Sequence, residues 1–177
     1  MNKIELLAPA GNLEKAKIAI LYGADAVYIG GKQFSLRSRA SNFSLEEMKE
    51  LVDFANERGA HVHVTVNMLP HEEDLNGLED YLLALDQIGV HAIIVCSPAI
   101  MMKAKELGCH YEVHISTQHS STNSNAVAFW KEKEWIVWYW EENVRCIRLK
   151  QFAKRTFYQS KFLYMVACVF LLVVAVS

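Results

Sequence analysis

The last 44 residues of the chain lack the residues that usually form turns. All eight glycines, all three prolines and all seven histidines lie before position 134. Because glycine and proline mark most turns and helix ends, a natural α/β segment of this length rarely lacks both. The charge balance changes at the same place: residues 1–133 carry 12 Lys and Arg against 17 Asp and Glu, whereas residues 134–177 carry 6 against 3. These absences predict two unlike parts, 1–133 and 134–177.

Several patterns of known chemistry are also missing. The four cysteines, Cys96, Cys109, Cys146 and Cys168, show no C-x-x-C spacing, which favours neither a disulfide framework nor a zinc site. The N-terminal residues show no signal-peptide pattern, so we expect a cytoplasmic protein in a reducing compartment. A formal net charge of −2 predicts no strong attraction to polyanions, and we expect no DNA partner.

What the first 133 residues do contain is a repeat that begins at a glycine. Each of four glycines follows a stretch with helical periodicity and precedes, two residues later, a short run rich in Val and Ile. Glycine readily takes the left-handed conformation that ends a helix, and a run that is apolar on both faces is typical of a parallel strand. The four glycines are Gly23, Gly59, Gly89 and Gly108.

Helix starts are marked by residues that cap helices. Asn12 precedes LEK, Ser44 has Glu47 three residues later as in a capping box, and a further start is indicated at the Ser-Pro pair 97–98. The side chains of such residues accept hydrogen bonds from backbone N–H groups of the first helical turn. Another helix is expected over NSNAVAFWKEK, residues 123–133.

With an opening strand near IELLAPA, the repeats give five strands and at least four connecting helices in alternation. Such alternation predicts the α/β class, with a parallel sheet and right-handed crossovers. Two architectures stay open, a doubly wound sheet and part of an eight-stranded barrel. No G-x-G-x-x-G follows the first strand, which disfavours a dinucleotide-binding fold. We therefore expect a partial TIM-barrel-like parallel sheet of about five strands over residues 1–133.

The tail, residues 134–177, breaks the repeat where another glycine-led strand is due. From Lys133 the chain reads K-E-W-I-V-W-Y-W, yet DNA that encodes this stretch can encode G-x-D-R-V-V-L in another frame. Loss of one base among the A-rich Lys and Glu codons near residue 133 would produce the tail. We therefore expect an out-of-frame translation product with an irregular or helical, non-native structure.

An apolar run of 15 residues, 162–176, lies at the end of this tail. A membrane-spanning helix needs about 18–20 residues, so the run is short for that role. Arg155 and Lys161 precede it, as in a tail anchor with a positive inner side. We expect membrane association only if the run is genuine coding sequence.

Residues 1–133 resemble the N-terminal part of peptidase family U32, the collagenase-like protease family. The matching stretches are ELLAPAGNLEKAKIAILYGADAVYIGGKQFSLRSRASNF, HVHVTVNML and YEVHISTQHSSTNSNAVAFW, of which the first is long and specific. The resemblance covers nearly all of residues 1–133 and none of the tail. It implies a TIM-barrel-like N-terminal region.

The resemblance also implies one of two activities. Members are described as proteases, whereas others resemble proteins that support hydroxylation of tRNA or rRNA bases and hold a cysteine-bound metal or iron–sulfur centre. The family's cysteine signature resembles H-G-x-M-C-x-x-x-x-G-x-C, which the chain as written lacks. We therefore expect a truncated, inactive peptidase with no cofactor of its own and a peptide as partner. The alternatives are an RNA-base hydroxylation factor, with an RNA as partner, and a non-catalytic or tail-anchored module.

Candidate binding residues stand where the expected strands end, because function in an α/β barrel lies at the C-terminal strand ends. Gly11, Asn67, Thr117 and Gln118 occupy such positions and are candidates for contact with a substrate or an anion. Gly11 also stands beside a helix start, where an anion can approach backbone N–H donors. The alternative for Gly11 is an ordinary turn between strand and helix.

Two arginines and a histidine complete the candidate set. Arg37 and Arg39 follow the second strand in FSLRSRASNF, and arginine suits bidentate binding of carboxylate or phosphate; the alternative is a solvated loop. His114 is a site candidate because it lies near a strand end. His61 and His63 alternate on one strand face, and such a pair can bind metal. No acidic or cysteine partner has an evident spacing, so we expect core or turn roles for this pair and no metal site.

No sequence pattern independently supports a peptidase mechanism. H-E-x-x-H and G-x-S-x-G are both absent. Cys96 at a strand end is a candidate thiol nucleophile, with a buried structural cysteine as the alternative. The peptidase assignment therefore depends on the family resemblance alone.

Overall fold

Parallel strands alternate with helices along the chain in a computed structural model that describes residues 5–36, 42–119, 125, 129–130, 137–138 and 163–165. The five strands expected from the sequence are present: β1 (Glu5–Pro9), β2 (Ala26–Gly30), β3 (His61–Val66), β4 (Ala92–Val95) and β5 (Glu112–Ile115). Between them lie α1 (Leu13–Leu21), α2 (Leu45–Asn56), α3 (Leu78–Ile88) and α4 (Pro98–Glu106), with short 3-10 turns η1 (Glu72–Leu75) and η2 (Thr117–His119).

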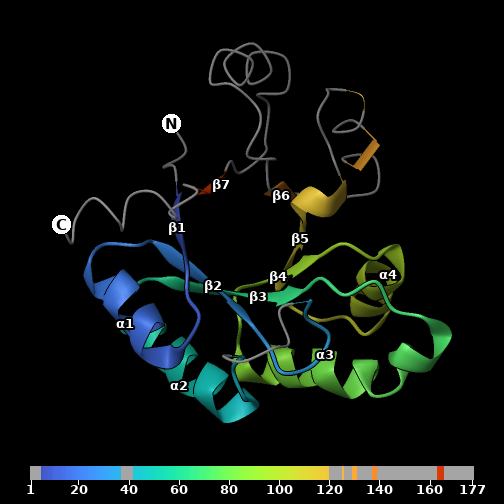
Figure 1. Ribbon diagram of the computed structural model, residues 1–177, viewed down its shortest axis with the longest axis horizontal. Helices are drawn as coiled ribbons and strands as arrows, with labels where there is room; N and C mark the ends of the chain where they lie inside the picture. The colour runs from blue at the N-terminus through green and yellow to red at the C-terminus, as the bar shows by residue number, and fades with distance from the viewer. Residues whose placement is uncertain are drawn as a thin grey trace.

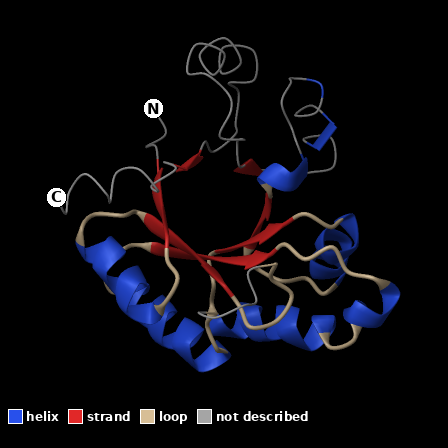
Figure 2. Ribbon diagram, in the orientation of Figure 1, coloured by secondary structure: helices blue, strands red, loops and turns tan. Residues whose placement is uncertain are grey.

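The strands form one parallel sheet in the order β5-β4-β3-β2-β1, so each strand pairs with its neighbour in the chain. At the centre of the register, Val64 pairs with Ile29 on one side and Ile93 on the other. The sheet curves into an arc, and α1 to α4 all lie on its convex side (Figures 1 and 2). A doubly wound sheet carries helices on both faces. The arrangement is therefore the wall of an α/β barrel, as the sequence predicted.

The local signals in the sequence have the expected structural effects. Asn12 caps α1 by accepting a hydrogen bond from the Lys15 backbone N–H at 2.9 Å. Ser44 and Glu47 form a reciprocal capping box at the start of α2, with distances of 3.3 and 2.8 Å. The four repeat glycines have φ angles between 66° and 98°, the left-handed region in which a side chain is strained.

The start of α3 differs from the sequence expectation. The stretch with helical periodicity that precedes Gly89 begins at Asp74, but the structure has the 3-10 turn η1 and then a break before Leu78. Gly77 takes a left-handed φ of 79° at this break, which an α-helix does not accommodate. The Asp74 carboxylate instead accepts a hydrogen bond from the His71 N–H at 2.9 Å. The helical periodicity of the sequence therefore continues across a position where the structure has a turn.

The core lies between the sheet and the helices. Alternate side chains of β2 to β5 face outward and pack against apolar residues of α2, α3 and α4. These outward residues are Val27, Ile29, Val62, Val64, Val66, Ile93, Val95 and Ile115. A smaller apolar group, Leu7, Ala26 and Ile94 with Tyr28, lies on the concave inner face. The remaining inner positions of the strands carry mainly polar side chains.

Two short strands of the tail extend the sheet at its edges. β6 (Val137–Trp138) pairs with β5, and β7 (Leu163–Met165) pairs with β1, both in parallel. Irregular or helical structure was expected there, so these residues differ from the prediction. Open strand edges offer unpaired N–H and C=O groups, and Val, Trp and Tyr favour strands. Most of the tail lies outside the described residues, and so does most of the helix expected over 123–133, of which Asn125, Phe129 and Trp130 are described as helical.

The apolar run 162–176 also lies outside the described residues, apart from β7. Within the described part of the chain, no helix is both long enough and apolar enough to cross a membrane.

Candidate functional site

The polar side chains of the inner face form two groups along the strands, one at the C-terminal ends and one that extends from there toward the N-terminal ends. At the C-terminal end lies the group that we call the strand-end group: Ser35, Thr65, Asn67, Cys96, Ser116 and Gln118. Next to it, toward the N-terminal end, lies the group that we call the histidine cluster: Glu5, His61, His63, His91, Glu112 and His114. In α/β barrels the C-terminal end carries the chemistry.

The strand-end group begins with two buried hydroxyls. The Ser35 and Thr65 hydroxyl oxygens lie 3.1 Å apart, and the Thr65 hydroxyl donates to the Ile29 carbonyl at 3.1 Å. Gly30 makes this approach possible, because a Cβ there would lie 3.1 Å from the Ser35 oxygen and 3.4 Å from the Thr65 oxygen. The hydroxyl pair ties the segment after β2 to the end of β3.

Asn67 and Cys96 continue the group on the next strand ends. The Asn67 side-chain oxygen accepts a hydrogen bond from the Leu36 N–H at 3.2 Å, and the Cys96 thiol donates to the Asn67 carbonyl at 2.9 Å. Burial raises the pKa of the Cys96 thiol. A thiol that stays protonated and donates to a carbonyl is not an activated nucleophile, which agrees with the structural alternative for this cysteine.

Ser116, Gln118 and His119 form the last part of the group, after β5. The Ser116 hydroxyl lies 3.3 Å from the Gln118 side-chain oxygen, and the Gln118 N–H donates to the Ser116 hydroxyl at 3.4 Å. Burial lowers the pKa of His119, whose ring meets the edge of Trp130 at 4.7 Å. Gln118 is exposed, so its amide can meet a ligand. Thr117 lies beside it in η2, as its position in the sequence predicted.

The loop after β2 is held close to this end of the barrel. Phe34 adopts a positive φ of 56°, which is uncommon for a residue with a side chain, and its ring packs on Tyr81 at 5.3 Å. Asn42 donates to the Gly31 carbonyl at 2.8 Å, so both ends of the loop are anchored at the strand ends. Arg37 and Arg39 lie between these anchors but outside the described residues.

Gly11 lies at the C-terminal end of β1, as expected, and is exposed. Asn12 follows it directly and caps α1, so the Lys15 N–H already has an acceptor. The structure thus places Gly11, Asn67, Thr117 and Gln118 at the same end of the strands.

His114 differs from these residues in its contacts. It is buried in β5 in register with Ile94 and, one strand further, Thr65, but its Nε2 atom lies 3.0 Å from a Glu112 carboxylate oxygen. Its ring meets the edge of the His63 ring at 4.9 Å. His114 thus lies near the end of β5, as the sequence indicated, while its ring belongs to the histidine cluster.

The histidine cluster also contains an acidic side chain that sequence spacing did not reveal. The Glu5 carboxylate oxygen lies 2.8 Å from His61 Nδ1 and 3.9 Å from His63 Nε2. Glu5 precedes His61 by 56 residues, and only the pairing of β1, β2 and β3 brings the two together. Burial, with the neighbouring His114, His91 and His61 rings, holds the pKa of His63 well below its usual range. His63 therefore stays neutral in the folded protein.

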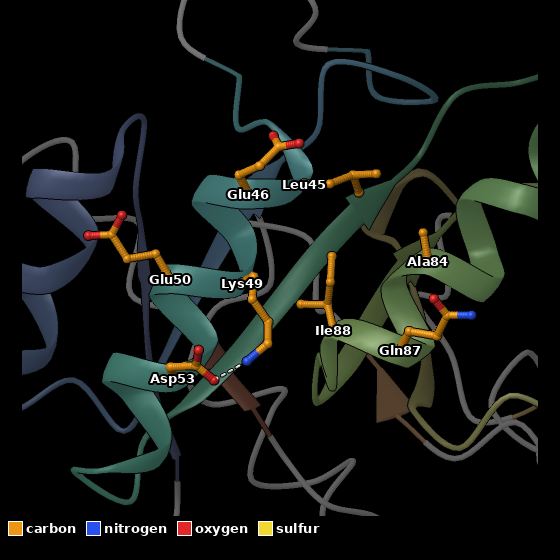
Figure 3. A pocket seen from close by; sticks show the side chains of 8 residues that line it. All are labelled: Leu45, Glu46, Lys49, Glu50, Asp53, Ala84, Gln87 and Ile88. Atoms are coloured by element: carbon orange, nitrogen blue, oxygen red, sulfur yellow. Dashed lines mark hydrogen bonds and ion pairs between the residues drawn. The ribbon is translucent and has the colours of Figure 1, made fainter.

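A shallow groove lies on the outer surface, between α2 and α3 (Figure 3). Lys49 and Asp53, one turn apart on α2, form an ion pair at its edge. The residues that line it are Leu45, Glu46, Lys49, Glu50, Asp53, Ala84, Gln87 and Ile88. The groove is on the helical side of the barrel wall, away from both polar groups of the inner face.

A cysteine-bound metal or iron–sulfur centre does not fit the described residues. Cys96 follows β4 at the C-terminal end of the strands, whereas Cys109 precedes β5 at the N-terminal end. Cys146 and Cys168 lie outside the described residues. Such a centre needs several thiolates around one point, and the two described cysteines are on opposite ends of the barrel.

The fold and the polar strand ends define a TIM-barrel-like α/β protein, and comparison with known proteins narrows this class. A family model for peptidase family U32 matches residues 11–136. The chain belongs to peptidase family U32. The match ends close to position 134, where the composition changes.

Some curated relatives are named as RNA-hydroxylation proteins and others as proteases. The chain is 54% identical over 131 residues to tRNA hydroxylation protein P1 of Bacillus subtilis, which covers 74% of this chain and 31% of that protein. It is 44% identical over 118 residues to the 23S rRNA 5-hydroxycytidine C2501 synthase of Escherichia coli, with 66% and 17% covered. It is 34% identical over 131 residues to a collagenase of Porphyromonas gingivalis, with 73% and 31% covered. The chain thus spans about a third or less of the length of these relatives.

Solved structures support the barrel fold. A U32 peptidase aligns with a TM-score of 0.50 at 13% identity, over 67% of this chain and 50% of that one. The enzyme 2,3-dimethylmalate lyase aligns with a TM-score of 0.57 at 14% identity, over 93% and 67%. At such low identity these likenesses show the fold alone.

Proposed function

We propose that this chain supplies part of the barrel of a protein that supports hydroxylation of an RNA base, and that tRNA is its substrate class. The observation that carries the proposal is the order of the relatives: the match at 54% identity is to a tRNA hydroxylation protein, whereas matches to a protease and a collagenase are at 39% and 34%. The peptidase expected from the family name becomes the second candidate, supported by the collagenase match.

The strand-end group suits recognition of a nucleobase. Its side chains are hydroxyls, amides and a protonated thiol, which can donate to and accept from the edges of an unstacked base. The exposed amide of Gln118 and the half-buried amide of Asn67 are the groups best placed to do so. A cysteine peptidase would need an activated thiolate, and the Cys96 thiol, with its raised pKa, does not provide one. The role proposed for these residues is to bind and orient the base.

Binding of unmodified tRNA tests the proposal directly. We expect fluorescence anisotropy to show salt-dependent binding of labelled tRNA by the full chain, since phosphate contacts dominate RNA affinity. Asn67→Ala should weaken binding about tenfold, because a buried polar contact to a base contributes roughly 1–3 kcal/mol. The matched control is Gln87→Ala, which removes an exposed amide from the outer groove and should leave the affinity unchanged.

The hydroxylation of tRNA itself can be measured in cells. A full-length relative that carries Asn67→Ala at the corresponding position should restore fewer hydroxylated tRNA nucleosides to a deletion strain than the unchanged relative, as measured by mass spectrometry. Unchanged tRNA binding in Asn67→Ala, together with cleavage of unfolded peptides by the purified chain, would replace this proposal with the peptidase reading.

A further inference from the structure

Three side chains of the histidine cluster converge from two strands that are not direct neighbours. Glu5 lies on β1, and His61 and His63 lie two residues apart on β3, so all three face the inner side of the barrel. β2 runs between them, and its residue opposite His61 is Ala26. Because the Ala26 side chain is small, the Glu5 carboxylate reaches across β2 to both imidazoles.

We propose that Glu5, His61 and His63 form a binding site for a divalent transition-metal ion, with Zn²⁺ as the ion of choice. Two imidazoles and one carboxylate are a ligand set of zinc sites that leave one coordination position open. The three ligand atoms all lie within 4.8 Å of one another.

The distances need little adjustment to hold the ion. Ligand atoms about 2.0–2.2 Å from a tetrahedral zinc ion are separated by about 3.3 Å. The Glu5 oxygen is now 2.8 Å from His61 Nδ1 and 3.9 Å from His63 Nε2. Each of these two pairs has to change by roughly half an ångström, and the two imidazole nitrogens, which lie within 4.8 Å of each other, approach by side-chain rotation without a change in the strands.

The neighbouring rings hold the two imidazoles in place. His91 stacks face to face on His61 with ring centroids 3.7 Å apart, and the His114 ring packs against His63 while bonded to Glu112. Residues that orient metal-bound histidines in this way commonly contribute to the affinity of the site for its metal ion. The His63 side chain is fully buried and that of His61 is 41% exposed, so an ion enters from the His61 side.

The donor atoms select the class of ion. Imidazole nitrogen suits Zn²⁺, Ni²⁺ and Cu²⁺, whereas Mg²⁺ and Ca²⁺ prefer oxygen ligands throughout. The site is at the N-terminal end of the strands, on the opposite end from the strand-end group. It is therefore independent of the proposed RNA chemistry.

Titration of the full chain with Zn²⁺ tests the site. The protein is stripped with a chelator, its accessible cysteines are blocked by alkylation, and Zn²⁺ is added in competition with a chromophoric chelator. We expect one equivalent to bind, and Co²⁺ in its place to give a tetrahedral absorption spectrum. His61→Gln and Glu5→Gln should each weaken binding by on the order of 100-fold, since even the loss of supporting residues costs 10- to 100-fold.

His110→Gln is the matched control. His110 also pairs with a carboxylate, Asp86 at 3.0 Å, but it is highly exposed and outside the cluster. This variant should bind Zn²⁺ as the unchanged chain does. Glu5→Gln keeps a hydrogen-bonding oxygen of the same size, so a circular dichroism melt of that variant separates loss of a ligand from loss of the fold. Absence of stoichiometric Zn²⁺, or equal affinity in the unchanged chain and His61→Gln, would overturn the proposal.

Discussion

The two ends of the barrel's inner face carry different chemistry on the same strand. At its C-terminal end β3 leads into Thr65 and Asn67, which are fixed by hydrogen bonds to a hydroxyl and to backbone groups. At its N-terminal end β3 presents His61 and His63, which are fixed by ring packing and by the Glu5 carboxylate. The period of two in a strand puts all four on one face. One strand can therefore present uncharged hydrogen-bonding groups to a ligand at one end and metal ligands at the other.

The largest expected effect is at the C-terminal end, at Gly31 after β2. A Cβ on Gly31 would lie 2.1 Å from the Tyr81 hydroxyl oxygen and 3.0 Å from a methyl group of Met48. Overpacking of a buried site typically costs 1–3 kcal/mol, so we expect Gly31→Ala to lower the free energy of unfolding by about 3 kcal/mol. Urea denaturation followed by circular dichroism measures this loss.

A second substitution checks the cause. The Tyr81 hydroxyl is buried and has no hydrogen-bond partner among the described residues, so Tyr81→Phe alone should be neutral or slightly stabilising. Combined with Gly31→Ala it should recover a large part of the lost stability. If the double variant is no more stable than Gly31→Ala, the close approach to the hydroxyl is not the reason for the loss.

The barrel wall could be predicted from the sequence because its signals are local. The glycines with positive φ, the capping box at Ser44 and the five strands all follow from residues close together in the chain. The contact between Glu5 and His61 could not be predicted, because it depends on which strands pair and in what register. For the same reason the contacts of the His114 ring with His63 and Glu112 could not be predicted, although its place near the end of β5 could.

An intermediate effect is expected for the hydroxyl pair of the strand-end group. Thr65→Val keeps the shape of the side chain but removes its hydrogen bonds to Ser35 and to the Ile29 carbonyl. A buried hydrogen bond contributes about 1 kcal/mol, so the free energy of unfolding should fall by about 1–2 kcal/mol. In a double-mutant cycle with Ser35→Ala we expect a coupling of roughly 1 kcal/mol. Additive losses would mean that the two hydroxyls act separately.

The smallest effect is expected at the N-terminal end in the absence of metal. His61 is 41% exposed and its pair with Glu5 is open to solvent, so His61→Gln should change the free energy of unfolding by less than about 1 kcal/mol without zinc. With Zn²⁺ present the effect of His61→Gln should become large. An ion that binds only the folded state stabilises the unchanged chain by about 2.7 kcal/mol at 100 times its dissociation constant, and the variant should lose this stabilisation. Thermal melts with and without Zn²⁺ should therefore separate the unchanged chain from His61→Gln only when the ion is present. A loss that is equally large in both conditions would mean that His61 serves the fold rather than a metal ion.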